Sequence, residues 1–197
     1  MNLLPYGPRA VLAEFATLDE VVAAAGAWRA ARLPGVVDVV PAARTVLVAH
    51  DGTLDVALLT AAAVVASPSA ATAAVVIDMV YDGEDLAAVA ATAGWSVEEL
   101  VRRHSDATYT VAFCGFMPGF PYLTGLPAEL ELPRRASPRE RVPAGSVALA
   151  AGYCGIYPRE SPGGWHLLGR THAVLWADDR DPPALLPPGT TVRFRPA

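Results

Sequence analysis

Proline and glycine interrupt the chain every few residues from residue 109 onward, which leaves this half of the molecule no room for a long helix. The stretches between them are short and rich in β-branched and aromatic residues, as strands are. Many short strands with frequent turn signals are typical of a closed or partly closed barrel, so we predict a β-barrel domain over residues 83–197. The strand-like segments are YTVAFCGF (109–116), SVALAAGYCGIY (146–157), WHLLGRT (165–171), AVLWAD (173–178) and TTVRFRP (190–196).

The residues before them show a different pattern, in which helix-like and strand-like stretches alternate. Thr17 and Glu20 form the T-x-x-E signature of a capping box, which predicts a helix from there to about Leu33. A second helix is predicted over residues 54–66, with S-P-S as its stop. The predicted strands are RAVLAEFAT (9–17), GVVDVV (35–40), RTVLVAH (44–50) and AAVVIDMVY (73–81). This order is that of a ferredoxin-like split βαβ unit, so we predict an α+β chain whose residues 1–82 form a ferredoxin-like domain.

Two more helices are predicted at the start of the second domain, over residues 84–93 and from Ser96 to His104, the latter opened by a second capping box of Ser96 and Glu99. A pair of helices joined by a glycine is also the pattern of a DNA-binding helix-turn-helix, with Arg102 and Arg103 on phosphate. Against DNA binding, the chain carries a formal net charge of −5, and arginines in a last helical turn simply favour the helix dipole. We therefore expect no nucleic-acid partner.

Composition limits the chemistry further. The chain has 53% hydrophobic and 18% charged residues, as folded proteins with a large core do. All fifteen basic residues are arginines, so a lysine-containing phosphate loop, a Schiff base and a biotin-carrying lysine are excluded. Two cysteines, Cys114 and Cys154, are too few for a disulfide framework. With no signal-peptide pattern in MNLLPYGPRA and no apolar run that could span a bilayer, we expect a cytoplasmic protein without a membrane partner.

The segment FCGFMPGFPYLTGLP (113–127) combines aromatic residues with prolines and glycines that forbid a helix. Phe116, Phe120 and Tyr122 would therefore sit on a loop whose backbone the prolines hold. Such a loop makes a good pocket wall or partner-binding ridge. It could equally fold back with its aromatic side chains buried over the barrel core, and the residues alone leave both readings open.

A second dense stretch is GIYPRESPGGWHLLGRT (155–171). In a regular strand, His166 and Arg170 would fall on one face, where His166 could act as an acid or base and Arg170 could hold a carboxylate or phosphate. The alternative for His166 is a hydrogen-bonded residue without a catalytic role. For Arg170 it is an ion pair with a local carboxylate such as Glu160.

A third stretch, PRRASPRERVPAGSV (133–147), contains Arg134, Arg135, Arg139 and Arg141. It could be an anion site or a solvated connecting loop. The four histidines are scattered, and no metal-ligand spacing and no G-x-S-x-G nucleophile motif occurs, so we expect no metal site in this chain.

At these stretches the sequence resembles a family that comprises the B subunit of the bacterial ATP-dependent 5-oxoprolinase and is also called KipI or allophanate hydrolase subunit 1. The resemblance extends to part of the carboxyltransferase region of urea carboxylase. It covers nearly all of the second domain, in family order. The matching blocks are YDGEDLAAVA (81–90), GFMPGFPYLTGLP (115–127), PRRASPRERVPAGSV (133–147), GIYPRESPGGWHLLGRT (155–171) and LLPPGTTVRF (185–194).

The resemblance implies a ferredoxin-like domain followed by a cyclophilin-like β-barrel. It also implies a subunit, inactive alone, of a complex that hydrolyses 5-oxo-L-proline to L-glutamate with hydrolysis of ATP. ATP, with Mg²⁺ expected through the complex, is then the cofactor, and the partners are a C subunit with a homologous barrel and an A subunit. On this basis His166 and Arg170 are the candidate catalytic residues. The pocket or subunit seam is assigned to Phe116, Pro118, Gly119, Phe120, Pro121, Tyr122, Arg134, Arg135, Ser146, Tyr157, Pro162, Gly163, Gly164, Trp165, His166, Arg170 and Thr171.

One departure and two alternative functions remain. Relatives commonly read Gln-Thr where this chain has Tyr153 and Cys154, which changes the hydrogen bonding available there. The same resemblance also admits a KipI-like inhibitor of a sensor histidine kinase, or half of a urea-carboxylase-like carboxyltransferase. The missing lysine excludes the biotin-carrier role but not the acceptor role.

Overall fold

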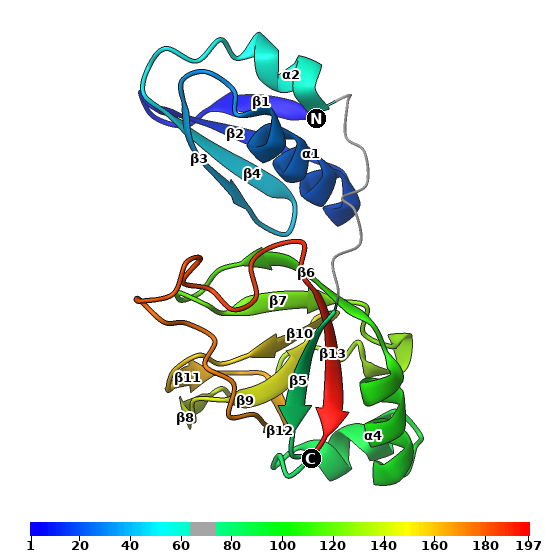
Figure 1. The fold of residues 1–197 in the computed structure, drawn as a ribbon. Coiled ribbons are helices and arrows are strands. Elements are labelled where there is room, and N and C mark those ends of the chain that lie inside the picture. The colour runs from blue at the N-terminus through cyan, green and yellow to red at the C-terminus, as the bar shows by residue number, and fades with distance from the viewer. Residues whose placement is uncertain (64–73) are drawn as a thin grey trace. The chain divides into compact units, whose positions relative to one another are not determined.

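The computed structural model describes residues 1–63 and 74–197, and the chain divides into two compact units, Met1–Ala71 and Thr72–Ala197 (Figure 1). Each unit has a hydrophobic core of its own. The predicted end of the second helix and its stop, residues 64–69, lie outside the described residues. Within the described part of the chain, no helix has both the length and the apolar character needed to cross a membrane.

The first unit is a four-stranded sheet with two helices against one face. Thr17 and Glu20 form the predicted capping box at the start of its first helix. Trp28 of that helix is fully buried and donates a hydrogen bond from its indole nitrogen to the Leu59 carbonyl at 2.9 Å, which ties the two helices together. The elements are β1 (Asn2–Pro5), β2 (Ala10–Glu14), α1 (Leu18–Ala31), β3 (Val36–Pro41), β4 (Thr45–His50) and α2 (Ala57–Ala63).

The strand membership of this sheet differs from the ferredoxin-like expectation. The order is β1-β2-β4-β3, and every neighbouring pair is antiparallel. The predicted strand over 73–81 is not part of it, and the unpredicted β1 pairs with the edge of β2 that β4 leaves free. The ferredoxin-like arrangement is therefore not confirmed: the split βαβ core of β2, α1, β3 and β4 is present, but an N-terminal strand completes the sheet.

The predicted strand over 73–81 belongs to the second unit. The predicted domain boundary after residue 82 therefore lies too far along the chain. β5 (Val75–Met79) pairs in parallel with β13 (Thr191–Pro196) over five residues. Its inward side chains, Ile77 and Met79, are buried in the core of the second unit. The strand was correctly predicted, but its partner lies more than a hundred residues away and no local pattern reveals it.

The second unit is a nearly closed, barrel-like sheet with helices and a small hairpin outside it (Figure 1). Its seven strands follow the order β12-β9-β10-β7-β6-β13-β5. The segment AVLWAD forms no strand, only an isolated bridge between Trp176 and Ala184. The remaining elements are α3 (Leu86–Thr92), α4 (Val97–Asp106), β6 (Tyr109–Cys114), β7 (Pro121–Thr124), the 3-10 helix η1 (Ala128–Leu130), β8 (Arg139–Val142), β9 (Ser146–Ala150), β10 (Tyr153–Ile156), β11 (Ser161–Gly163) and β12 (His166–Arg170).

The two edges of the seven-stranded sheet meet at Val80 and Arg170, whose backbone N–H groups each donate to the other's carbonyl at 2.9 Å. Gly169 permits this approach, because a Cβ on it would lie 2.0 Å from the Val80 carbonyl oxygen. The bridge leaves the sheet without a free edge at this point, which agrees with the predicted closed or partly closed barrel.

Strand β9 separates two cores in the second unit, because all five of its residues are buried. Val147 and Leu149 face the barrel interior, whereas Ala148 and Ala150 face an outer aromatic cluster. The hairpin of β8 and β11 contributes Val142 to that outer cluster. The outer cluster consists of Phe120, Val142, Ala148, Ala150, Tyr157, Trp165 and Leu167, with Met117, Tyr122 and Tyr153 packed against it.

Candidate functional site

The aromatic loop divides between core and surface. Phe120 is 1% exposed and packs edge-to-face against Tyr157 and Trp165, with ring centroids 5.1 and 5.5 Å apart. Phe116 is 62% exposed and has a positive φ of 68°, a conformation that is rare for a bulky side chain. Of the two readings that the sequence left open, burial therefore holds for Phe120, while Phe116 stands at the surface.

The first glycine of S-P-G-G is required by the tyrosine beneath it, and the second connects the hairpin to the arginine-rich segment. A Cβ on Gly163 would lie 2.3 Å from the Tyr157 hydroxyl oxygen, so the backbone of β11 passes directly over that phenol. Gly164 accepts a hydrogen bond from the backbone N–H of Arg135 at 2.9 Å, which attaches the arginine-rich segment to the hairpin. Trp165 is 5% exposed and belongs to the outer cluster.

His166 and Arg170 do not share a face of β12, because a bulge between Leu167 and Gly169 shifts the register. His166 pairs opposite Leu149 and Arg170 opposite Ser146, three residues apart on regular β9. Residues directly opposite each other point to the same side of a sheet, so an odd separation places the two on opposite sides. The expectation of a shared His/Arg face is wrong.

Both residues have structural partners. His166 Nε2 lies 2.9 Å from the Pro133 carbonyl oxygen, which it can reach as a donor in the Nε2-protonated tautomer. Arg170 pairs with Asp82 at 2.9 Å, and both side chains are largely exposed. Glu160, the partner considered from the sequence, pairs with Arg141 instead. A ligand role for Arg170 stays a prediction.

A buried carboxylate that the sequence analysis missed connects three of the matching blocks. Asp85 is 6% exposed, and its Oδ1 accepts from Arg135 at 2.5 Å and from Arg139 at 3.0 Å. Its Oδ2 accepts from the Leu167 backbone N–H at 2.7 Å. Burial by itself raises the pKa of Asp85, but the contacts from Arg139, Leu167 and Arg135 outweigh burial and lower it. Asp85 thus joins the start of α3 to β12 and to the arginine-rich segment. The sequence does carry a signal for Asp85: it is an acidic residue directly before a predicted helix, in a chain whose arginines cluster in another segment.

The arginine cluster is mostly neutralised by carboxylates. Arg135 and Arg139 contact Asp85, Arg139 also contacts Glu84 at 3.0 Å, and Arg141 contacts Glu160 at 2.6 Å. Arg134 is exposed and makes no ion pair or side-chain hydrogen bond within the described residues. Of the four, Arg134 is therefore the guanidinium that can bind an added anion.

The other predicted pocket residues lie around this outer face without a polar ligand geometry of their own. Gly119 has a φ of 80°, and a Cβ on it would lie 2.9 Å from the Trp176 Cβ. Thr171 is buried and accepts a hydrogen bond from the Ala173 N–H at 3.1 Å. Pro121 and Ser146 are buried, and Pro118 and Pro162 are exposed.

A second polar cluster lies inside the barrel. His104 at the end of α4 is fully buried, with its Nδ1 2.8 Å from the Tyr81 hydroxyl and its Nε2 3.6 Å from the Cys154 sulfur. Desolvation lowers the pKa of His104 to about 3, so the imidazole is neutral. Burial raises the pKa of Cys154, so this thiol stays protonated and is no nucleophile. Tyr153, the other departure from the usual Gln-Thr pair, packs edge-on against Tyr122.

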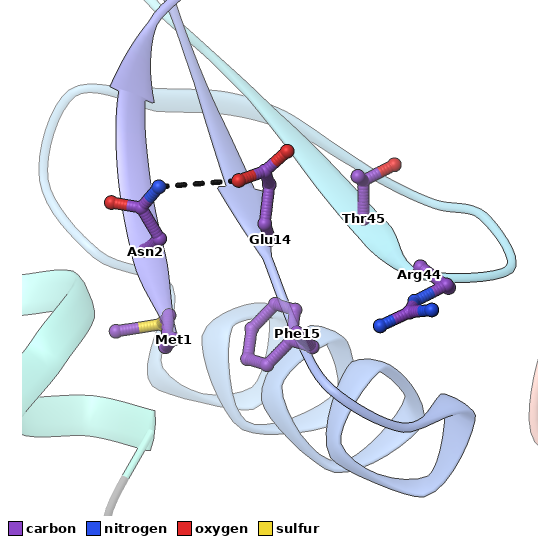
Figure 2. Close-up of a pocket in the computed structure, with 6 residues that line it drawn as sticks. All are labelled: Met1, Asn2, Glu14, Phe15, Arg44 and Thr45. Atoms are coloured by element: carbon purple, nitrogen blue, oxygen red, sulfur yellow. Dashed lines mark hydrogen bonds between the residues drawn. The ribbon is translucent and has the colours of Figure 1, made fainter.

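A hollow of about 510 Å³ lies in the first unit, at the ends of β1, β2 and β4 (Figure 2). Asn2 donates a hydrogen bond to Glu14 at 3.1 Å along its wall. None of the predicted site residues lines it. The lining residues are Met1, Asn2, Glu14, Phe15, Arg44 and Thr45.

The second unit carries groups on its outer face that suit anion binding. Across residues 1–63 and 74–197, no three His, Cys, Asp or Glu side chains gather as metal ligands do. The Cys–His pair among the described residues that could act in covalent catalysis, Cys154 and His104, is sealed in the barrel core. The outer face instead combines a free guanidinium with tyrosine hydroxyl groups, a combination suited to holding an anion.

This fold and surface define a class, an α/β chain whose larger unit is a nearly closed, barrel-like sheet with an arginine- and tyrosine-bearing outer face. Residues 1–186 match the family of carboxyltransferase domains, subdomain C and D, and the chain belongs to that family.

Known proteins refine this assignment. The B subunit of 5-oxoprolinase from Escherichia coli O157:H7 is 51% identical over 123 residues, which are 61% of this chain and 56% of that protein. The chain spans about half the length of the curated relatives it matches. The crystal structure of TTHA0988 is 37% identical and matches with a TM-score of 0.83, covering 96% of this chain and 40% of that one. The urea amidolyase of K. lactis matches with a TM-score of 0.71 over 99% of this chain and 15% of that one; at 19% identity this likeness shows the fold alone.

Proposed function

We propose that this chain is the B-type subunit of a 5-oxoprolinase, which hydrolyses 5-oxo-L-proline to L-glutamate coupled to hydrolysis of ATP. The observation that carries the proposal is the identity of 51% to a relative named as the B subunit of 5-oxoprolinase. Four of the five blocks that suggested this family in the sequence are brought together around Asp85 and the outer aromatic cluster.

The same site favours a subunit that is inactive alone. Opening an unstrained lactam needs activation of the amide and a positioned water or nucleophile. The described residues supply an anion-binding guanidinium, and the buried Cys154 and His104 cannot reach a substrate. The remaining groups would come from two further subunits, A and C, the latter with a barrel homologous to this one. We further propose a cytoplasmic location and a cyclophilin-like classification for the barrel.

ATP, with Mg²⁺, is proposed to be held through the complex, because the N-termini of the two longer helices, α1 and α4, do not fit a triphosphate. Thr17 and Ser96 already accept hydrogen bonds from the first turns of α1 and α4. Both first turns also carry acidic side chains, Asp19 and Glu20 in α1 and Glu98 and Glu99 in α4, which repel phosphate.

The test is reconstitution. The purified chain, alone and with candidate A and C subunits, would be assayed for ATP-dependent release of glutamate from 5-oxo-L-proline. We expect no turnover from the chain alone and turnover from the complete mixture. Turnover by the single chain would contradict its assignment as one part of a complex, and a complete mixture that is inactive on 5-oxoproline would contradict the substrate.

The second candidate function is half of a carboxyltransferase, and the family of carboxyltransferase domains that matches residues 1–186 favours it. In that case the partner would be a biotin-dependent carboxylase, because this chain has no lysine to carry biotin. Transfer of ¹⁴C-labelled carboxylate from carboxybiotin to an amide acceptor, in the presence of this chain, would distinguish it from ATP-driven lactam hydrolysis.

A further inference from the structure

Arg134 differs from the neighbouring arginines because it contacts no carboxylate within the described residues. Arg135, Arg139 and Arg141 each contact a carboxylate, as does Arg170 on β12. Arg134 has no such partner in the described chain. A guanidinium without a carboxylate keeps its full capacity for a bidentate contact with an incoming anion.

The backbone on both sides of Arg134 is held in place. The Pro133 carbonyl lies 2.9 Å from His166 Nε2, and the Arg135 N–H donates to the Gly164 carbonyl at 2.9 Å. The Arg135 guanidinium is fixed by Asp85 as well. An arginine between two anchored residues loses less backbone entropy on binding a ligand than one on a free loop.

Two tyrosine rings of the outer aromatic cluster, Tyr122 and Tyr157, both pack against Phe120, each with its ring centroid 5.1 Å from that of Phe120. The Tyr157 hydroxyl lies beneath Gly163, next to the Gly164 that holds Arg135, and the Tyr122 ring centroid lies 5.6 Å from that of Trp165. Neither hydroxyl makes a hydrogen bond within residues 1–63 and 74–197. Burial raises the pKa of both phenols, and the nearby charge of Arg134 partly opposes this rise. Both hydroxyls therefore remain protonated at neutral pH and can donate.

We propose that Arg134, with the hydroxyl groups of Tyr122 and Tyr157, forms a binding site for the oxoanion group of a small molecule, a carboxylate or a phosphate. The inference rests on the proposed function in one respect: if 5-oxo-L-proline is the substrate, its carboxylate is the group that would occupy this site. His166 then acts as a positioning residue, because it holds the Pro133 carbonyl next to Arg134. This explains the location of His166 without a catalytic role.

The experiment is calorimetric titration of the full chain at low ionic strength, where exposed charges are least screened. The probes are 5-oxo-L-proline, inorganic phosphate and 2-pyrrolidinone, the same lactam without the carboxylate. The variants are Arg134→Ala and Arg134→Lys. The control is Arg141→Ala, because Arg141 belongs to the same cluster but is neutralised by Glu160.

We expect 5-oxo-L-proline to bind the unmodified chain and 2-pyrrolidinone not to bind. Arg134→Ala should weaken the binding of 5-oxo-L-proline about tenfold or more, because a hydrogen bond from a charged group is lost. Arg134→Lys should retain part of the affinity, because it keeps the charge without the planar fork. Arg141→Ala should leave the affinity for 5-oxo-L-proline unchanged. Melting curves of both Arg134 variants should match the unmodified chain, since Arg134 has no partner to lose within the described residues.

The outcomes separate the site from the substrate. If phosphate binds in an Arg134-dependent way and 5-oxo-L-proline does not bind, the anion site stands and the proposed substrate is wrong. If 5-oxo-L-proline binds Arg134→Ala as tightly as the unmodified chain, the anion site is wrong and the proposed substrate survives. If no anion binds the unmodified chain, the inference is overturned.

Discussion

Phe116 and Phe120 lie in one loop, four residues apart, yet their surroundings are opposite. Phe120 fills the centre of the outer aromatic cluster and lies against Gly155, where a Cβ would come within 2.8 Å of its ring. Phe116 touches the edge of that cluster, with its ring centroid 5.5 Å from that of Phe120, and remains mostly in solvent. Sequence composition marks the loop but cannot distinguish these two places, because the turn at Pro118 and Gly119, where Gly119 has a φ of 80°, decides which side chain points inward.

Substitution of the two phenylalanines should therefore have unequal effects on stability. Phe120→Ala removes a fully buried ring and should lower the free energy of unfolding by about 3–5 kcal/mol. Phe116→Ala should change it by less than about 1 kcal/mol, because little buried area is lost. Urea denaturation of both variants measures the difference. Equal losses would mean that Phe116 is buried in solution.

His104 should make the protein sensitive to mild acid. Burial lowers its pKa from 6.5 to about 3, so the unfolded chain takes up a proton that the folded chain refuses. Its contribution is complete above pH 6.5 and is lost as the pH falls toward 3. Between about pH 7.5 and pH 5.5 the free energy of unfolding should drop by roughly 1 kcal/mol from this residue. The facing groups Tyr81, Tyr109 and Cys154 do not titrate in this range, since burial raises the pKa of each.

The matched variant for this measurement is His104→Gln, which cannot take up the proton. Urea denaturation at several pH values should show a lower stability for His104→Gln overall but a flatter dependence on pH below 6.5. An unchanged slope would show that other residues cause the acid sensitivity.

At the scale of elements, short-range sequence signals predicted the starts of the helices correctly, whereas the register of the strands could not be predicted. The capping box of Thr17 and Glu20 and the N-cap hydrogen bond of Ser96 are both present. Glu99 does not complete a second capping box but binds Arg102 and Arg103, and these ion pairs support the helix end. The bulge in β12 was invisible in the sequence, because a register shift depends on the neighbouring strand β9.

Asp85 holds elements together that no regular ladder joins. Asp85→Asn keeps the size of the side chain but leaves the guanidinium groups of Arg135 and Arg139 without their shared carboxylate. We expect the free energy of unfolding to fall by about 3 kcal/mol, the lower end for a broken buried ion pair, because Arg135 is partly exposed. Glu84→Gln is the control: its side chain is 74% exposed, and its loss should cost less than about 1 kcal/mol. Similar losses in both variants would contradict a special role for Asp85.

At the scale of the whole molecule, the barrel could be predicted from local signals but its strand membership could not. Frequent turn signals after residue 109 indicated the short strands, and the unit is indeed a nearly closed sheet. The strand 75–79 reads equally well as the last strand of a ferredoxin-like unit, since its alternation shows only that one face is buried. Which core buries that face depends on β13 at the other end of the chain.

The position of β5 leads to a test with two shortened chains. A chain of residues 74–197 contains β5 and should fold, because its core and both edges of its sheet are complete. A chain of residues 83–197 follows the boundary predicted from sequence and lacks Ile77, Met79 and the Val80 bridge to Arg170. Without them β13 loses its parallel partner and the barrel opens, so we expect no cooperative thermal transition by circular dichroism. Two chains that melt alike would show that β5 is dispensable and that the unit begins near residue 83.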